Sequence, residues 1–318
     1  MKKILLVESS ALDKKRINYI KKKFNKINFF LTSTNKSEIS KKIKNMDAII
    51  NPPRNILDNL FLKNSNKLKW IHIGGAGIED FVSEKLIKRK IILTNGKILQ
   101  GPSVADHAVA LLLSLTRNIK HHIKLSSGFK ISRPIELYKK SALIFGTGGI
   151  GSLVAERLKA FGMKTYGIDE EMVNLNAFYD ELFIFEELNS IIKKADVVIC
   201  CSALTSKTKN IFNKNIFSKM KKNSFFINVS RGKLVNTQDL CNLLKKKHFR
   251  GVGLDVTDPE PLGKKSILVN HPNVILTPHV AGPSDNNRER SFDLVLKNLS
   301  RFSRDQILLN LVDIKKGY

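Results

Sequence analysis

The chain of 318 residues has only three cysteines, Cys200, Cys201 and Cys241. This number and spacing provide neither a disulfide framework nor a C-x-x-C motif, and we expect no metal site. Cys200 and Cys201 fall inside an apolar run, so they are expected to be strand residues rather than nucleophiles. A reducing cytoplasm is the simplest setting for such a chain.

Long apolar runs are also missing. The longest, around Val109 to Leu115, is far shorter than the roughly 20 residues that a membrane-spanning helix needs. Near the N-terminus the run Ile4–Val7 is followed at once by Glu8, which favours a first β-strand over a signal peptide. We therefore expect no membrane association, and the length is sufficient for two domains.

Acidic residues are scarce, since 28 Asp and Glu accompany 55 Lys and Arg and leave a net charge of +27. This charge could serve a nucleic acid or another anionic surface. It could equally come from solvated lysine-rich helix faces that also attract an anionic substrate. The basic runs lack interleaved aromatic residues and any nucleic-acid-binding motif, so we favour the second interpretation and expect no nucleic-acid partner.

The most informative segment is a strand, a glycine-rich turn, a helix and a second strand that ends on an acid. The apolar run Ala142–Phe145 leads into a G-x-G-x-x-G motif whose glycines are Gly146, Gly148 and Gly151. These glycines allow a tight turn, the approach of a pyrophosphate to bare backbone and close packing of helix on sheet. Asp169 follows at the distance at which a carboxylate accepts from ribose hydroxyls and repels a 2′-phosphate. The segment predicts a dinucleotide site that prefers NAD to NADP.

Elsewhere short apolar runs alternate with helical periodicity, which indicates an α/β fold with doubly wound parallel sheets. The predicted strands are Ile4–Val7, Asn28–Leu31, Ala48–Ile50, Trp70–Ile73, Ile91–Leu93, Thr165–Ile168, Ala195–Cys201, Phe225–Val229, Gly251–Leu254 and Val274–Leu276. Helices are predicted over Asp13–Phe24, Ser37–Lys44, Ala105–Arg117 with Ser103 as its cap and an extension towards Leu125, Lys214–Met220, Thr237–Lys246 and 285–304. Ser126–Pro134 is predicted as a loop and 170–190 as a looser acidic stretch.

Ligands of such sheets bind beyond the carboxyl ends of the strands. After the strand Trp70–Ile73, the turn Gly74–Gly77 could offer backbone N–H groups to a carboxylate, although an ordinary turn would look the same. In the second half of the chain the residues at these ends are Asp169, Ser202, Arg231, Asp255 and His279. We expect them to lie along one edge of the sheet.

Three residues carry the chemistry that a nicotinamide cofactor would need. Arg231 can bind a carboxylate through two parallel hydrogen bonds. His279 can donate or accept a proton near neutral pH, and Glu260 lies in a loop stiffened by prolines. Together they favour hydride transfer at C2 of a 2-oxo or 2-hydroxy acid, but spacing alone does not pair Glu260 with His279.

Four stretches resemble the NAD-dependent D-isomer-specific 2-hydroxyacid dehydrogenase family, which includes glyoxylate/hydroxypyruvate reductases and phosphoglycerate dehydrogenases. They are Ser103–Ala108, the glycine segment up to Asp169, Ile227–Val235 and Gly253–Gly282. The resemblance implies a Rossmann NAD-binding domain, 101–283, inserted in a flavodoxin-like substrate domain made of 1–100 and 284–318. It also implies a homodimer.

The same resemblance implies a role for each candidate residue. Arg231 would bind the substrate's carboxylate and carbonyl, His279 would be the acid–base and Glu260 its partner. Asp255 would meet the nicotinamide carboxamide. The cofactor would further be lined by Gly149, Ile150, Ser202, Val229 and Ser230, and the carboxylate-binding amides would come from Gly75, Ala76 and Gly77.

Two qualifications accompany the resemblance. Ala203–Ser206 stands where the family often has Pro-Leu-Thr-Pro, which predicts a less rigid loop beside the cofactor. The fold and the three catalytic residue types also occur in NAD-sensing corepressors, which bind partners and would suit a basic surface. Turnover of 2-oxo acids distinguishes the two functions.

Overall fold

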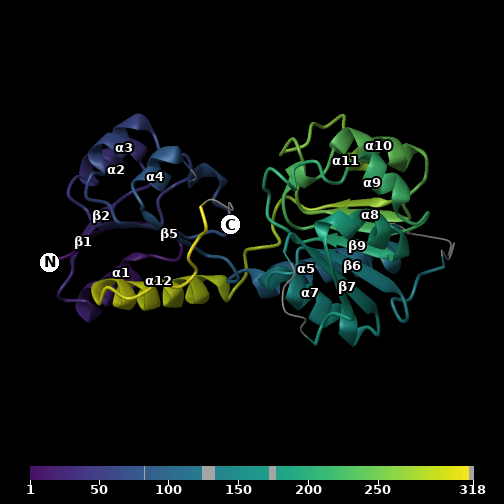
Figure 1. The fold of residues 1–318 in the computed structure, drawn as a ribbon, viewed down its shortest axis with the longest axis horizontal. Helices are drawn as coiled ribbons and strands as arrows, with labels where there is room; N and C mark the ends of the chain where they lie inside the picture. Colours follow the sequence, from purple (N-terminus) through teal and green to yellow (C-terminus); the bar gives the residue numbers. More distant parts are fainter. Residues whose placement is uncertain (82, 124–132, 172–176, 315–318) are drawn as a thin grey trace. The chain divides into compact units, whose positions relative to one another are not determined.

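The computed structural model describes residues 1–81, 83–123, 133–171 and 177–314. The chain forms two compact units, the first made of Met1–Gln100 with Ser284–Tyr318 and the second of Gly101–Pro283 (Figure 1). Among the described residues, no helix combines the length and the apolar character needed to cross a membrane.

The first unit is built on a five-stranded parallel sheet with the order β2-β1-β3-β4-β5, the flavodoxin-like order. Its strands are β1 Lys3–Val7, β2 Asn28–Thr32, β3 Ala48–Ile50, β4 Trp70–Ile73 and β5 Ile92–Asn95. Its helices are α1 Lys14–Lys23, α2 Lys36–Lys42, α3 Asn59–Asn64, α4 Glu84–Lys88 and α12 Asn287–Ser303.

Helices cover both faces of this sheet (Figure 1). Ile39 of α2, Phe61 of α3 and Leu86 of α4 pack on one face with the odd-numbered side chains of β1. On the other face α1 and α12 bury Ile17 and Leu299 against the even-numbered side chains. Because side chains alternate along a strand, both faces of these strands are apolar, as a parallel sheet requires.

The second unit contains a seven-stranded parallel sheet with the order β12-β11-β10-β9-β6-β7-β8. Counted from β6, this is the Rossmann order 3-2-1-4-5-6 with one further strand beside the sixth. Its strands are β6 Ser141–Phe145, β7 Lys164–Asp169, β8 Glu181–Ile184, β9 Val197–Cys200, β10 Phe225–Asn228, β11 Gly251–Leu254 and β12 Val274–Leu276.

Helices again form a layer on each face of the sheet (Figure 1). They are α5 Gly101–Thr116, α6 Ile119–Ile123, α7 Gly149–Ala160, α8 Leu188–Ile191, α9 Lys214–Lys219, α10 Thr237–Lys245 and α11 Ile267–Asn270. α5 and α7 share one core with Ile144, whereas α8, α9 and α10 share the other with Leu143. The predicted fold class, two doubly wound parallel sheets, is confirmed.

Three local predictions were wrong. Ser103 does not cap α5, because the helix begins at Gly101 and the Ser103 hydroxyl donates to the carbonyl oxygen of Ala281 at 2.6 Å. The helix also ends at Thr116, just before Asn118, whose φ of 54° is left-handed, and α6 follows as a separate helix. The stretch 170–190 contains the edge strand β8. Leu125, most of the loop Ser126–Pro134 and residues 172–176 lie outside the described residues.

Candidate active site

The strands that lead to the candidate site end at one level of the second sheet. Phe145 of β6 pairs with Cys200 of β9, and Cys200 pairs with Asn228 of β10. The same row continues through Leu254 of β11 to Leu276 of β12. The five segments that follow these strands therefore leave the sheet side by side, and they contain the glycine motif, Ser202, Arg231, Asp255 and His279.

The glycine motif has the backbone that a pyrophosphate needs. Gly146 has a φ of +100°, and an added Cβ there would lie 2.5 Å from the backbone nitrogen of Ser202. A Cβ on Gly151 would lie 1.9 Å from the Gly146 carbonyl oxygen, so only glycine lets α7 approach β6 so closely. A Cβ on Gly148 would enter open space at the N-terminus of α7. This space and the N–H groups of Gly149 and Ile150 suit an anionic phosphate.

Asp169 lies at the end of β7 and faces the glycine turn. Its Oδ2 accepts from the backbone N–H of Thr147 at 2.6 Å and from the Thr147 hydroxyl at 2.9 Å. Its Oδ1 accepts from the N–H of Glu170 at 2.8 Å. The carboxylate is thus fixed beside the turn, and its remaining lone pairs can accept from ribose hydroxyls.

The turn after β10 is held by the buried side chain of Asn228. Its Oδ1 accepts from the N–H of Ser230 at 3.0 Å, and its Nδ2 donates to the carbonyl oxygen of Arg231 at 3.0 Å. The Ser230 hydroxyl donates to the carbonyl oxygen of Ser202, which ties this turn to the end of β9. Val229 is also buried. These contacts fix the backbone on both sides of Arg231.

The loop after Ser202 is fixed without prolines. The hydroxyl of the buried Thr208 donates to the carbonyl oxygen of Ala203 at 2.8 Å and accepts from the N–H of Thr205 at 2.8 Å. The expected loss of rigidity in Ala203–Ser206 is therefore offset by a hydroxyl inside the loop.

Arg231 and the Glu260 loop are brought together by Gly232. A Cβ on Gly232 would lie 2.0 Å from the carbonyl oxygen of Thr257, so the turn that carries Arg231 packs directly on the chain leading to Glu260. Arg231 is half-buried, and its Nη1 donates to the carbonyl oxygen of Ser230 at 2.9 Å. A guanidinium group presents a planar fork of N–H donors, and this shape matches a carboxylate.

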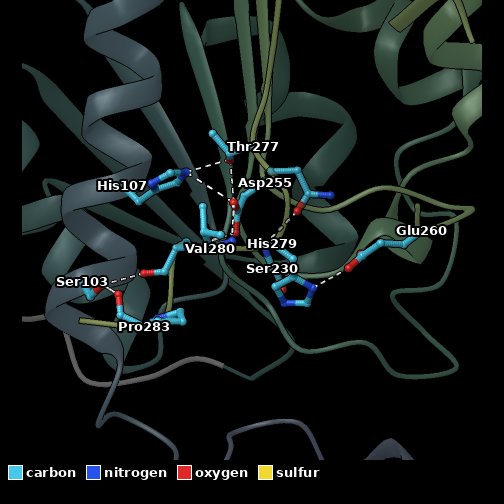
Figure 2. A network of polar contacts seen from close by, with 11 residues as sticks. Ser103, His107, Ser230, Asp255, Glu260, Thr277, His279, Val280 and Pro283 are labelled. Atoms are coloured by element: carbon cyan, nitrogen blue, oxygen red, sulfur yellow. Dashed lines mark hydrogen bonds and ion pairs between the residues drawn. The ribbon is translucent and has the colours of Figure 1, made fainter. Parts of the chain in front are cut away.

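Glu260 and His279 form a hydrogen-bonded pair, with Oε1 of Glu260 2.7 Å from Nδ1 of His279 (Figure 2). The Glu260 loop contains cis peptide bonds before Pro259 and Pro261. Both side chains are about 40% exposed. Because a carboxylate accepts, the Nδ1–H donates to it, and Nε2 is the nitrogen left for a ligand.

A pocket of about 440 Å³ lies beside this pair. Its walls combine the polar groups of Glu260 and His279 with apolar side chains, among them Leu262 and Leu276. Such a mixture of apolar walls and a few polar groups is typical of sites for small organic ligands.

Asp255 is almost fully buried and is bonded to the loop that carries His279. Its carboxylate accepts from the N–H groups of Val280 and Ala281, each at 3.0 Å, and from the hydroxyl of Thr277 at 2.6 Å (Figure 2). Nε2 of His107, on α5, lies 3.4 Å from Oδ1 of the Asp255 carboxylate. Thr277 and His107 were not among the residues that the sequence indicated as functional, although both lie in stretches that resemble the family.

The glycine turn of the first unit, which follows β4, is held by its carbonyl groups. The carbonyl oxygen of Gly75 accepts from the N–H of Gly96 at 2.8 Å, and that of Ala76 accepts from Nδ2 of Asn95 at 2.7 Å. A Cβ on Gly75 would enter open space. The turn ends at Gly77 and can offer its backbone N–H groups to a carboxylate.

Comparison with known proteins agrees with this geometry. Residues 109–281, more than half of the chain, match the model of the D-isomer specific 2-hydroxyacid dehydrogenase, NAD binding domain. The chain belongs to the D-isomer specific 2-hydroxyacid dehydrogenase family. The matched residues contain the glycine motif, Asp169, Arg231, Glu260 and His279.

Relatives in this family extend over most of the chain. The glyoxylate reductase of Pyrococcus horikoshii is 32% identical over 86% of this chain and 84% of that protein. The D-3-phosphoglycerate dehydrogenase of Methanocaldococcus jannaschii is 30% identical over 89% of this chain and 55% of that protein. The crystal structure of a D-isomer specific 2-hydroxyacid dehydrogenase family protein from Aeromonas salmonicida matches with a TM-score of 0.83 and 26% identity, over 98% of this chain and 99% of that one.

Proposed function

We propose that the protein is an NAD-dependent 2-hydroxyacid dehydrogenase that works as a reductase of a small 2-oxo acid. The observation that carries the proposal is the 2.7 Å bond between Glu260 and His279, at the sheet edge that also holds Arg231 and the glycine motif. A proton donor, a carboxylate-binding cation and a dinucleotide site are the groups that this reaction needs.

In this proposal, NADH bound at the glycine motif would be the source of the hydride for C2 of the substrate. His279 donates the proton to the carbonyl oxygen through Nε2, while Glu260 accepts from Nδ1–H and fixes the orientation and tautomer of the ring. Arg231 binds the substrate carboxylate and polarises the carbonyl group. In the oxidative direction the same histidine accepts the proton.

The cofactor would lie along the edge of the second sheet. Gly146, Gly148, Gly149, Ile150 and Gly151 would hold the pyrophosphate, and Asp169 would bind the ribose hydroxyls and favour NAD over NADP. Ser202, Val229, Ser230 and Asp255 would line the nicotinamide end. Residues 101–283 are thus proposed as the NAD-binding domain.

The remaining residues, 1–100 and 284–318, are proposed as the substrate domain. There Gly75, Ala76 and Gly77 would bind the substrate carboxylate through their amides. We further propose a homodimer in the cytoplasm. Because the relatives include a glyoxylate reductase and a D-3-phosphoglycerate dehydrogenase, glyoxylate, hydroxypyruvate and phosphohydroxypyruvate are the first substrates to test.

The test is NADH oxidation, followed by absorbance, over these three acids, pyruvate and branched 2-oxo acids, with NADPH in parallel. We expect one acid to exceed the others and NADH to be preferred. Arg231→Ala should lower kcat/KM by a hundredfold or more, because a charge-assisted carboxylate contact is lost. Lys233→Ala, which removes an exposed cation two residues away, is the matched control. Tight NADH binding without turnover of any acid would refute the proposal and favour an NAD-sensing binding protein.

A further inference from the structure

The loop that carries His279 has an unfavourable backbone conformation. His279 has a φ of 55°, which lies in the left-handed region that residues other than glycine rarely adopt. Such a conformation persists only where the surrounding structure imposes it.

Asp255 holds the loop at four points. Its backbone carbonyl oxygen accepts from the N–H of His279 at 2.8 Å. Its side chain binds the N–H groups of Val280 and Ala281 and the hydroxyl of Thr277. With a side-chain exposure of 1%, this carboxylate depends on these donors to compensate for its burial.

Helix α5 contacts the same loop. The hydroxyl of Ser103 donates to the carbonyl oxygen of Ala281 at 2.6 Å. One turn further along the helix, Nε2 of His107 lies 2.9 Å from Oγ1 of Thr277 and 3.4 Å from Oδ1 of Asp255 (Figure 2). Residues four apart lie on one face of a helix, so this face of α5 contacts the loop twice.

The direction of these hydrogen bonds follows from the chemistry of the groups. Thr277 has one hydroxyl hydrogen, and at 2.6 Å from the Asp255 carboxylate it donates that hydrogen to Asp255. The same oxygen must therefore accept from His107, so Nε2 of His107 carries a proton. The result is a chain of donors from α5 through Thr277 to the carboxylate that holds the His279 loop.

We propose that His107 is a positioning residue for the proton transfer. It acts through Thr277 and Asp255 and so helps to hold the loop of His279 in its left-handed conformation. The inference rests on the proposed function for its effect on turnover, but its effect on the loop is independent of turnover. The Nε2–H of His107 keeps the Thr277 hydroxyl directed at Asp255, and the oriented carboxylate accepts from the backbone N–H groups of Val280 and Ala281.

Two variants test this chain of donors, and two more control for it. His107→Phe removes the donor while keeping a ring, and His107→Gln restores an N–H at a similar reach. Thr277→Val removes the hydroxyl and keeps the shape of the side chain. Asp106→Asn changes the neighbouring residue of α5, which is exposed and pairs with Arg157 instead.

The first readout is hydrogen exchange at the amides of Val280 and Ala281, measured by NMR or mass spectrometry. We expect exchange there to be about tenfold faster in His107→Phe and in Thr277→Val, and unchanged in His107→Gln and Asp106→Asn. In the double variant His107→Phe/Thr277→Val, the amides of Val280 and Ala281 should exchange no more than about twofold faster than in Thr277→Val alone, because His107 acts through Thr277.

The second readout is NADH oxidation with the best 2-oxo acid. His107→Phe should lower kcat about tenfold while the Kd for NADH stays within about twofold, and His107→Gln should restore most of the rate. The inference would be overturned if hydrogen exchange at Val280 and Ala281 were unchanged in His107→Phe. It would also be overturned if His107→Gln lost as much kcat and as much protection from exchange as His107→Phe. If the wild-type protein turns over no acid but the exchange results hold, the positioning of the loop stands and the proposed function fails.

Discussion

The buried histidine of the first unit should make that unit sensitive to mild acid. His72 lies on β4 and is 1% exposed. The Nε1–H of Trp70 donates to the hydroxyl oxygen of Thr94 at 2.8 Å, which leaves the hydroxyl hydrogen for Nδ1 of His72 at 2.9 Å. His72 is therefore neutral, and burial lowers its pKa from 6.5 to about 4.

The sign and size of the effect follow from this pKa. Between pH 6.5 and pH 4 the unfolded chain binds a proton at His72 and the folded chain does not, so stability falls as the pH falls. Each pH unit in that window costs about 1.4 kcal/mol. We expect His72 to lower the free energy of unfolding of this unit by about 2 kcal/mol at pH 5.

The assay uses the single tryptophan of the chain, Trp70, whose ring lies 5.0 Å from that of Phe302 in the same unit. Its fluorescence during urea unfolding reports on this unit alone. The comparison is with His72→Asn, in which the amide oxygen can accept from Thr94 but does not titrate. Between pH 7 and pH 5, with a further measurement at pH 6, the free energy of unfolding should fall more steeply in the wild-type protein than in His72→Asn.

Carboxylates do not confuse this comparison. Hydrogen bonds and salt bridges lower the pKa values of Asp13 and Asp305 below their usual values, so these groups titrate mainly below the window used and do so in both variants. If wild-type and His72→Asn proteins lose stability in parallel between pH 7 and pH 5, His72 accepts a proton in the folded state and the assigned hydrogen bonds are wrong.

Two further predictions concern the candidate site. Glu260→Gln should lower kcat about tenfold, because a neutral amide oxygen accepts from the Nδ1–H of His279 more weakly than a carboxylate and orients the ring less firmly; an unchanged kcat would contradict the role of the pair. Gly148→Ala should fold with an unchanged Tm and bind NADH at least tenfold more weakly, because its Cβ enters the phosphate space. Gly151→Ala should weaken NADH binding and also lower the Tm, because its Cβ would lie 1.9 Å from the Gly146 carbonyl oxygen. Thermal melts and NADH titrations distinguish the two.

Local sequence patterns were sufficient for most of the fold. The strand, glycine, helix and acid order around Gly146 predicted β6, α7 and β7 because each element is encoded within a few residues. β8 was missed because its four residues, Glu181–Ile184, are not fully buried and lie in an acidic stretch. The break after α5 was missed because the apolar periodicity continues past Asn118, and a left-handed asparagine leaves no clear pattern.

The site was predicted residue by residue, but its contacts were not. The bond between Glu260 and His279 joins two loops on different strands, and no periodicity links residues 19 positions apart. His107 and Asp255 are farther apart still, on a helix and a strand end that meet only through packing. Such pairs depend on how the layers are stacked, which is a property of the whole sheet.

The interrupted first unit has a consequence for the order in which the chain is made. Residues 101–283 are contiguous, so the second unit has its whole core available once Pro283 has been synthesised. The first unit does not, because Val295, Leu299 and Phe302 of α12 complete the core that contains Ile4 and Trp70. During synthesis, one apolar face of the β1–β5 sheet is therefore covered only in part, by α1, while the entire second unit is translated, and the unit begun first is the last to be finished.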